Sequence, residues 1–402
     1  MQYNLFKLLY IIFFCLSSIF FFRPSFIPLS LLSYILYVNI FITLVIVLFK
    51  TRNLNIDFFR LSFILILLSI LISAISATYS WGQGLFNSFK AITFYLSYLL
   101  FFLLSTWKIR VKDIEKIVII LGFVYFVIYA ITFVFYPLPL FGDINSYDDS
   151  RGFQRIVLSG LGFLFLFSFY SLNKYLNKQQ FIWVIFFVIS VICIIMLLTR
   201  TLLVVSFIIF TLFILRKSNF LKKILAVMII GCFVYIITQM NFFQLLMKES
   251  IEQSKYKEDN IRILSATFYI NEFSPNTFSR IFGNGENYMD TSYASYMQYL
   301  QHTLGYYQDD IGYIGFYSKF GVIAILAYLF LIFKTYRVAI PEEYLYCKYY
   351  LYFIFLISLI IDAPFNVGYI TSIVFAAYIL NSKDLSKDNI NSMHQKIIFA
   401  YK

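Results

Sequence analysis

The chain has 402 residues, of which 61% are hydrophobic and only 13% carry a charge. A soluble globular domain carries about 25% charged residues, so this composition excludes an ordinary soluble protein. The net charge of +12 does not indicate nucleic-acid binding, because the basic residues fall in short segments between apolar runs, where membrane proteins carry them. The sequence predicts an all-α polytopic membrane protein, with residues 1–402 forming one integral domain.

Apolar runs of nearly 20 residues recur along the chain, and we interpret about twelve of them as transmembrane helices. They lie at residues 8–22, 29–49, 61–77, 91–106, 117–136, 157–172, 181–198, 202–215, 224–240, 312–333, 349–361 and 369–380. The first run leads into Arg23 and Pro24 without a small-residue cleavage site. We therefore expect a membrane helix there rather than a cleaved signal peptide.

Lysine and arginine are concentrated in alternate connectors between these runs. The basic connectors lie at residues 50–60, 108–116, 174–178, 216–223 and 334–348. Because basic connectors remain in the cytoplasm, this alternation predicts that both termini are cytoplasmic. It places residues 241–311, the one long polar segment, in the periplasm or outside the cell.

A single arginine interrupts the apolar run of residues 186–210. In one continuous helix Arg200 would lie in the middle of the bilayer, at a cost of at least about 2.5–3.5 kcal/mol. A tight hairpin avoids this cost by placing Thr199, Arg200 and Thr201 at the outer face. Arg200 is then expected on the same side as residues 241–311.

The long segment 241–311 carries most of the polar groups that suggest chemistry. They are Arg262, Arg280, the glycines Gly283 and Gly285 of the sequence IFGNG, His302, Asp309 and Asp310. The two glycines permit a tight turn or a close approach of the backbone to a ligand. An imidazole or a carboxylate can take a proton from a hydroxyl group. The alternatives are an exposed loop histidine and acidic residues that cap the following helix.

Five arginines are predicted to lie outside, near the membrane surface. They are Arg151, Arg155, Arg200, Arg262 and Arg280. Arginine keeps its charge and binds phosphate oxygens through a bidentate fork, so this set suits a diphosphate at the level of the lipid headgroups. The alternative is that these arginines pair with nearby acidic residues or with lipid phosphates. The sequence has no P-loop, zinc-ligand spacing or G-x-S-x-G motif, so we expect no nucleotide, metal or other cofactor.

Residues 190–335 resemble the bacterial O-antigen polymerase and ligase superfamily. The resemblance lies in TRTLLVVSFIIF at 199–210, a long loop with an arginine, an FGxG-like turn and a histidine, and DDIGYIGFYSKFGVIAILAYL at 309–329. It implies a GT-C-like helical bundle and metal-independent glycosyl transfer from an undecaprenyl-diphosphate-linked oligosaccharide. A polymerase uses another lipid-linked repeat unit as acceptor, whereas a ligase uses a lipid A core.

The resemblance also implies roles for individual residues. Arg200 matches the arginine at the end of a helix, Arg262 and Arg280 match loop arginines, and His302 matches the loop histidine. The family often has asparagine after this histidine, where the chain has Thr303. Asp309 and Asp310 are therefore alternative candidates for the base.

We expect a polysaccharide repeat-unit polymerase in a bacterial inner or plasma membrane. Its expected partners are the lipid-linked oligosaccharide and membrane lipid, with a chain-length regulator and a flippase implied by the resemblance alone. The alternatives are an O-antigen ligase-type transferase and a lipid-linked oligosaccharide flippase. A transporter is expected to show paired halves with broken helices, or charges at the midplane, whereas the predicted charges gather at one face.

Overall fold

The computed structural model describes residues 2–50, 58–136, 138, 140–142, 156–197, 199–216 and 261–382. Within these ranges every regular element is a helix, apart from an isolated bridge between Pro24 and Phe141. Five helices are long and apolar enough to cross a membrane. They are Leu29–Lys50, Phe59–Trp81, Leu85–Trp107, Val111–Val134 and Tyr313–Arg337. These helices confirm the predicted helical class and are consistent with a membrane protein.

The helices follow the predicted apolar segments. In chain order they are α1 (Gln2–Ser18), η1 (Phe20–Phe22), α2 (Leu29–Lys50), α3 (Phe58–Trp81), α4 (Leu85–Ile92), η2 (Thr93–Leu99), α5 (Leu100–Trp107), α6 (Val111–Val134), α7 (Leu161–Lys178), α8 (Phe181–Met196), α9 (Arg200–Leu215), α12 (Ile261–Asn271), α13 (Thr277–Phe282), α14 (Ser292–His302), η6 (Gln308–Asp310), α15 (Tyr313–Arg337), η7 (Glu342–Tyr344), α16 (Leu345–Ile357) and an unlabelled last helix, Ile370–Ser382. The predicted segment 224–240 lies outside the described residues, and every other predicted segment overlaps a helix.

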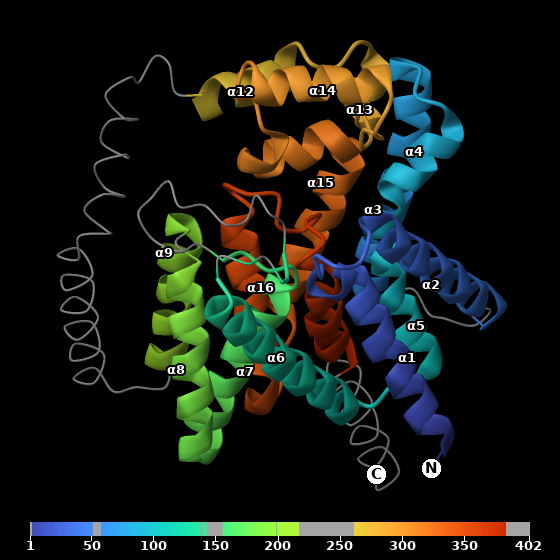
Figure 1. The fold of residues 1–402 in the computed structure, drawn as a ribbon. Coiled ribbons are helices and arrows are strands. Elements are labelled where there is room, and N and C mark those ends of the chain that lie inside the picture. The colour runs from blue at the N-terminus through green and yellow to red at the C-terminus, as the bar shows by residue number, and fades with distance from the viewer. Residues whose placement is uncertain are drawn as a thin grey trace, which may run out of the picture.

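Helix α7 is enclosed by other helices of the bundle (Figure 1). Its residues 162–173 are all buried, and it packs against α6, α8 and α16. A helix that is buried all round belongs in the core of a helical assembly. Outer helices instead expose large apolar side chains, such as Phe41 of α2, Phe181 of α8 and Val204 of α9, as expected for surfaces that face lipid.

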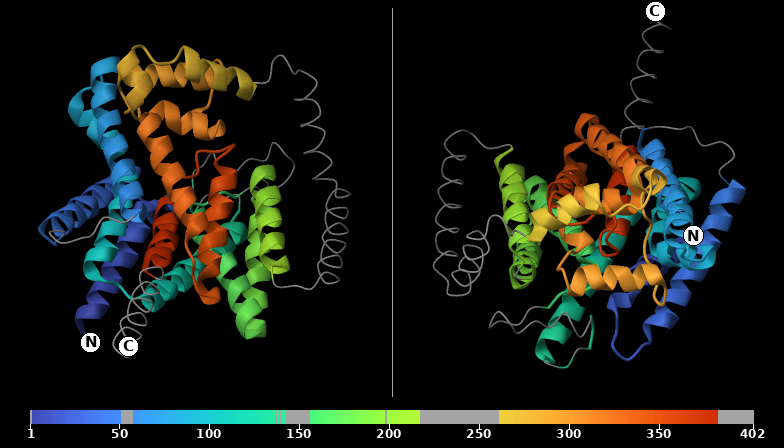
Figure 2. Two further views of the ribbon diagram at one scale, coloured as in Figure 1. Left: turned by 180° about the vertical axis from the view of Figure 1, so that it is seen from behind. Right: turned by 90° about the horizontal axis from the view of Figure 1, so that it is seen from above.

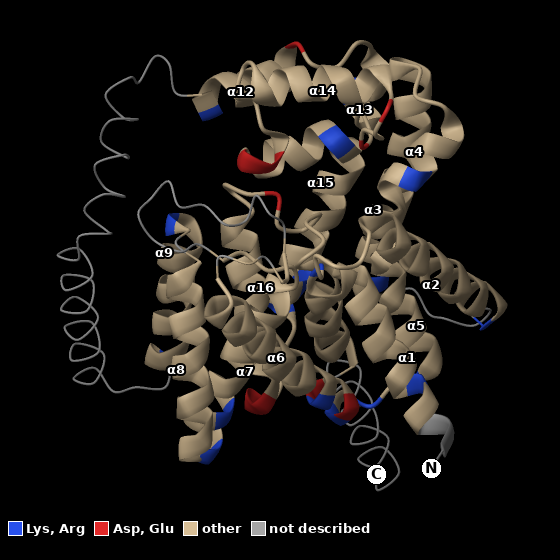
Figure 3. Cartoon of the chain, in the orientation of Figure 1, with Lys and Arg blue, Asp and Glu red and all other residues tan. Residues whose placement is uncertain are grey.

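Three of the connectors predicted to be cytoplasmic, at residues 108–116, 174–178 and 334–348, meet at one end of the bundle, where basic and acidic side chains gather (Figure 3). The amide of Asn173 at the end of α7 donates to the Glu343 carbonyl oxygen at 2.6 Å. Arg216 after α9 forms an ion pair with Glu342 at 3.7 Å. These contacts join the ends of α7 and α9 to η7. The side of the membrane on which this end lies remains a prediction.

The opposite end of the bundle is covered by α12, α13 and α14, which we call the surface layer (Figures 1 and 2). Its small apolar core contains Tyr269, Phe273 and Met297. Trp81, the last residue of α3, stacks on Tyr293 with the ring centroids 4.6 Å apart. The surface layer is therefore built directly on the end of α3. Residues 241–260 of the predicted long loop lie outside the described part of the chain.

Helices α8 and α9 form the predicted hairpin around Arg200. Helix α8 ends at Met196, Thr199 has an extended backbone (φ −101°, ψ 106°), and α9 begins at Arg200. The end at which these two helices join points towards the surface layer (Figure 1). Arg200 therefore lies at the end of the bundle that also carries α12 and α13.

Candidate functional site

Helix α15 is broken at Gly321, near its start. Gly321 has φ 76° and ψ −172°, so the helix of residues 313–320 changes direction before it continues as 322–337. A Cβ atom at this position would lie 2.3 Å from the carbonyl oxygen of Ile281. Only glycine combines this backbone conformation with such a close approach.

The IFGNG sequence packs into this break. The N–H of Asn284 donates to the Ser318 carbonyl oxygen, and the N–H of Gly285 donates to the Lys319 carbonyl oxygen, each at 2.8 Å. These bonds satisfy carbonyl groups that the interrupted helix leaves without intrahelical donors. The surface layer and α15 are therefore joined through their backbones.

Gly283 and Gly285 make the close backbone approach that their sequence allows. A Cβ atom on Gly283 would lie 2.3 Å from the Lys319 carbonyl oxygen, and one on Gly285 would lie 2.6 Å from the Ser73 carbonyl oxygen. Both glycines are buried. The observed approach is to the backbones of α15 and α3, and it explains both glycines without a ligand.

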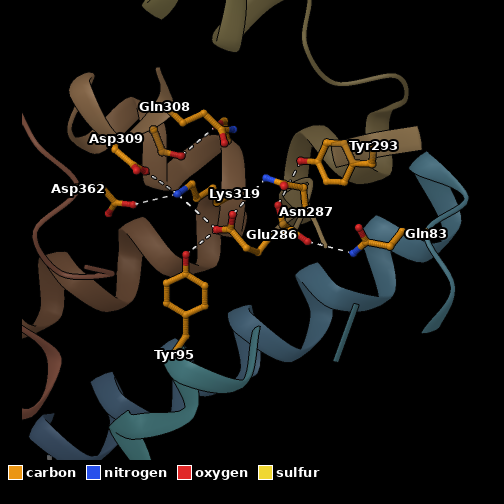
Figure 4. A network of polar contacts seen from close by, with 12 residues as sticks. Gln83, Tyr95, Glu286, Asn287, Tyr293, Gln308, Asp309, Lys319 and Asp362 are labelled. Carbon is orange, nitrogen blue, oxygen red and sulfur yellow. Dashed lines mark hydrogen bonds and ion pairs between the residues drawn. The ribbon is translucent and has the colours of Figure 1, made fainter. Parts of the chain in front are cut away.

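Lys319, just before the break, is the centre of a buried charge cluster (Figure 4). Lys319 is buried, with only 6% of the residue exposed. The ammonium nitrogen lies 2.7 Å from Asp309 Oδ1, 3.4 Å from Glu286 Oε2 and 3.6 Å from Asp362 Oδ2. We call these four residues the lysine cluster. A buried charge is costly unless it is paired, and here three separate segments supply carboxylates.

Glu286 connects the lysine cluster to the first half of the chain. The hydroxyl of Tyr95 donates to Glu286 Oε2 at 2.5 Å, and the amide of Asn287 donates to Oε1 at 3.3 Å. The amide of Gln83 donates to the Glu286 carbonyl oxygen at 3.0 Å. Tyr95 belongs to η2, a 3₁₀ stretch within the long helix Leu85–Trp107. Such a stretch inside a helix often marks a functional hinge.

Asp309 and Asp362 contact the same ammonium but have different surroundings. The Asp309 side chain is 69% exposed, and Lys319 lowers the pKa of its carboxyl group. Asp362 is only 5% exposed, and its Oδ1 has no hydrogen-bond partner. Burial raises the pKa of the Asp362 carboxyl to about 8, although Lys319 opposes this rise. One carboxylate is thus open to the surface, and the other lies inside the protein.

The lysine cluster is anionic when its groups are ionised, because one ammonium faces three carboxylates. Among the described residues, no group of three or more His, Cys, Asp or Glu side chains has an arrangement that could hold a metal ion. The acidic side chains here surround Lys319 instead. Their arrangement suits the acceptance of a proton or a hydroxyl hydrogen bond better than the binding of a diphosphate.

The structure brings one predicted catalytic residue, Asp309, into the lysine cluster. Asp310 is the next residue of η6 and is exposed. His302 ends α14 and is also exposed. Neither Asp310 nor His302 has a buried setting that singles it out as a base.

Three of the five predicted diphosphate-binding arginines lie in the described part of the chain, on different elements at the same end of the molecule (Figure 1). Arg200 begins α9 and Arg262 lies in the first turn of α12. Arg280 lies at the end of α13 and donates to the Asn271 carbonyl oxygen at 2.9 Å, so it also links α13 to α12. Arg151 and Arg155 lie outside the described residues.

Sequence analysis did not select Lys319, Glu286 or Asp362 as site residues. Lys319 had a usable signal, because a lysine inside a long apolar helix indicates a functional or paired site. Glu286 follows IFGNG directly, and its role depends on how that turn packs. Asp362 lies 43 residues beyond Lys319 in the chain, so only the fold reveals their contact.

A comparison of the chain with protein-family models, with curated proteins and with solved structures finds no match in any of the three. The geometry of the site and the residue pattern therefore carry the functional argument. An exposed carboxylate, fixed by a buried ammonium, lies at the end of the bundle that also carries several arginines.

Replacement of Lys319 by methionine is expected to destabilise the protein strongly. The change leaves three carboxylates without their shared cation, and the loss of one partner of a buried ion pair costs about 3–5 kcal/mol. Thermal unfolding of the purified protein in detergent measures the effect. Adding Asp362→Asn should restore part of the loss, because it removes one buried anion. Lys178→Met, at the exposed end of α7, is the control; an equal loss there would contradict this account.

Asp362 is expected to make the folded state less stable as the pH rises. Its folded pKa of about 8 exceeds the unfolded value of about 3.9, so the folded state binds the proton more tightly. The resulting stabilisation is fully present below about pH 4 and is lost as the pH rises through about 8. Asp362→Asn should flatten this part of the stability profile in thermal unfolding. An unchanged slope would show that the carboxyl does not titrate in this way.

Proposed function

We propose that the chain is a glycosyltransferase that polymerises polysaccharide repeat units at the outer face of a bacterial inner or plasma membrane. The donor is an undecaprenyl-diphosphate-linked oligosaccharide, and the acceptor is a sugar hydroxyl of another lipid-linked repeat unit. One observation carries the proposal: Asp309, exposed and held by buried Lys319, lies at the end of the bundle that also carries Arg200, Arg262 and Arg280.

The proposed reaction needs only the residue types that this end supplies. The acceptor oxygen bonds to the anomeric carbon, the bond between that carbon and the diphosphate oxygen breaks, and its electron pair stays on the diphosphate. Arginines stabilise the charge that develops on this leaving group. A carboxylate takes the proton of the acceptor hydroxyl. Because the lipid diphosphate already activates the donor, the reaction requires no nucleotide.

The depth of the lysine cluster supports chemistry at the lipid headgroups. Beyond the break, residues 322–337 of α15 form a helix about 24 Å long at a rise of about 1.5 Å per residue. This length covers most of a hydrocarbon core about 30 Å thick. If this part of α15 crosses the core, Lys319 and Asp309 lie near its outer boundary, where the diphosphate of a lipid-linked sugar also lies. The proposal includes about twelve crossings, with both termini in the cytoplasm.

An O-antigen ligase-type transferase would use the same groups with a different acceptor. A flippase for lipid-linked oligosaccharides is the second candidate, and one observation favours it. Two long helices are interrupted beside the lysine cluster, α15 at Gly321 and Leu85–Trp107 at η2, and transporters often place binding sites at broken helices. The position of the lysine cluster towards one end of the bundle favours the transferase.

Replacement of Arg200 tests the proposed diphosphate contact. Arg200→Ala should reduce polymerisation about 100-fold, the effect of removing one donor that stabilises a developing anion. Arg200→Lys should also be impaired, because lysine lacks the bidentate fork. The measurement is the length of surface glycan on a gel, at matched membrane levels of the protein. Arg337→Ala, at the opposite end of α15, is the control.

The outcomes separate the candidate functions. Single-repeat glycan at a normal protein level supports the polymerase, and full-length glycan from Arg200→Ala removes Arg200 from the mechanism. Loss of all surface glycan, with lipid-linked repeats retained inside the cell, favours the flippase. Glycan polymer of normal length that stays on the carrier lipid, with no transfer to the lipid A core, favours the ligase.

Replacement of Asp309 identifies the base. Asp309→Asn preserves the shape of the side chain but cannot take up a proton, so polymerisation should fall about 100-fold. Glycan length measures the effect, with Asp310→Asn and His302→Ala compared in parallel. Asp290→Asn serves as the control, because Asp290 is exposed and has φ 63°, which asparagine tolerates well. Wild-type glycan from Asp309→Asn, with loss in His302→Ala, would assign the role to His302.

A further inference from the structure

The proposed reaction uses Asp309 but leaves Asp362 without a role. Asp362 is buried, its Oδ1 has no hydrogen-bond partner, and its Oδ2 contacts Lys319. A buried polar atom without a partner costs about 1–3 kcal/mol. A protein that needed only a counter-ion for Lys319 already has Asp309 and Glu286. The third carboxylate therefore calls for a function of its own.

We propose that Asp309, Lys319 and Asp362 form a proton relay, which carries the proton of the acceptor hydroxyl from the exposed Asp309 to the buried Asp362. This inference rests on the proposed glycosyl transfer. It adds a proton-storage residue and names Lys319 as the group that connects it to the surface (Figure 4).

The geometry places both carboxylates against the same ammonium (Figure 4). Lys319 Nζ donates to Asp309 Oδ1 at 2.7 Å and lies 3.6 Å from Asp362 Oδ2. Lys319 Nζ and Asp362 Oδ2 need to approach by only about 0.5 Å to form a hydrogen bond. The backbone N–H of Asp362 also donates to the Asp309 carbonyl oxygen at 3.0 Å. This bond fixes the two carboxylate segments relative to each other beside the ammonium.

The relay moves one proton from Asp309 to Asp362 and leaves Lys319 protonated, as it was at the start. As the acceptor oxygen bonds to the anomeric carbon, its proton passes to the Asp309 carboxylate. Lys319 then gives a proton to Asp362 and receives the one on Asp309. The electron pair of the broken C–O bond remains on the lipid diphosphate. After the product leaves, the proton returns through Lys319 to Asp309, which is open to the solvent.

The electrostatic surroundings favour Asp362 as the final acceptor. The titratable groups that face Asp362 are Lys319, Asp309 and Glu286, together with the hydroxyls of Tyr95 and Tyr98. Burial raises the pKa of the Asp362 carboxyl to about 8, whereas Lys319 lowers that of Asp309.

Glu286 differs from Asp362 in its hydrogen bonds. Its two carboxylate oxygens already accept hydrogen bonds from Tyr95 and Asn287. Asp362 Oδ1, in contrast, is a buried carboxylate oxygen without a hydrogen-bond partner.

The pH dependence of polymerisation tests the relay. Asp362 must begin each cycle ionised, so the wild-type rate should rise with pH and level off above about pH 8. Asp362→Asn should lower the rate at pH 7.5 about 10-fold and remove this rise. The assay uses membrane vesicles that contain the full-length protein and lipid-linked repeat units accumulated by cells lacking its activity. The initial rate of polymer formation is measured across the pH range.

Two further variants separate a relay from a purely structural role. Asp290→Asn should keep the wild-type pH profile. Asp362→Glu should keep a rise in rate but displace it along the pH axis, because a different carboxyl group titrates. If Asp362→Asn also lowers the amount of protein in the membrane, the pH profile of Asp362→Glu decides between the two roles. A rise in rate that is displaced along the pH axis supports the relay, and a rise at the wild-type pH overturns it.

The outcomes distinguish the relay from the reaction on which it rests. A wild-type rate and pH profile in Asp362→Asn would overturn the relay while the polymerase remains. Loss of stability in Asp362→Asn, with an unchanged profile per folded protein, would also overturn it and assign Asp362 to structure. If wild-type vesicles form no polymer from the accumulated repeat units, the proposed function itself fails.

Discussion

The buried ammonium of Lys319 is the interaction on which the arrangement of this end of the protein depends. It lies 6% exposed at the start of a long apolar helix, where an unpaired charge is strongly unfavourable. Pairing requires carboxylates from η6, from the turn after IFGNG and from the connector after α16. One side chain thus draws three distant segments together, and through Glu286 it also reaches Tyr95 in η2.

The backbone at Gly321 explains how Lys319 can hold this position. A side chain does not fit at Gly321, because a Cβ atom there would meet the backbone of Ile281 and Gly283. The break exposes the carbonyl groups of Ser318 and Lys319, and the N–H groups of Asn284 and Gly285 bond to them. The same contact positions Glu286 beside the ammonium. Backbone hydrogen bonding and charge pairing therefore stabilise one arrangement together.

Sequence patterns could predict the helices well but could predict only part of the site. Apolar length locates helices such as α6, and the cost of a charge in the bilayer correctly predicts the hairpin at Arg200. The site depends on contacts between residues far apart in the chain, such as Asp362 with Lys319, and hydropathy does not encode such pairing. Gly283 and Gly285 illustrate a second limit of sequence-based prediction. The two glycines indicate that the backbone approaches another group closely, but the sequence does not show that this group is the backbone of α15 or α3.

The signs of the charges divide this end of the molecule into two regions. Three carboxylates around one ammonium make the lysine cluster an unfavourable place for a diphosphate, because like charges repel. The arginines of α9, α12 and α13 are the groups suited to that anion. On the proposed function, the leaving diphosphate and the acceptor hydroxyl therefore meet different elements, the first at arginines and the second at Asp309.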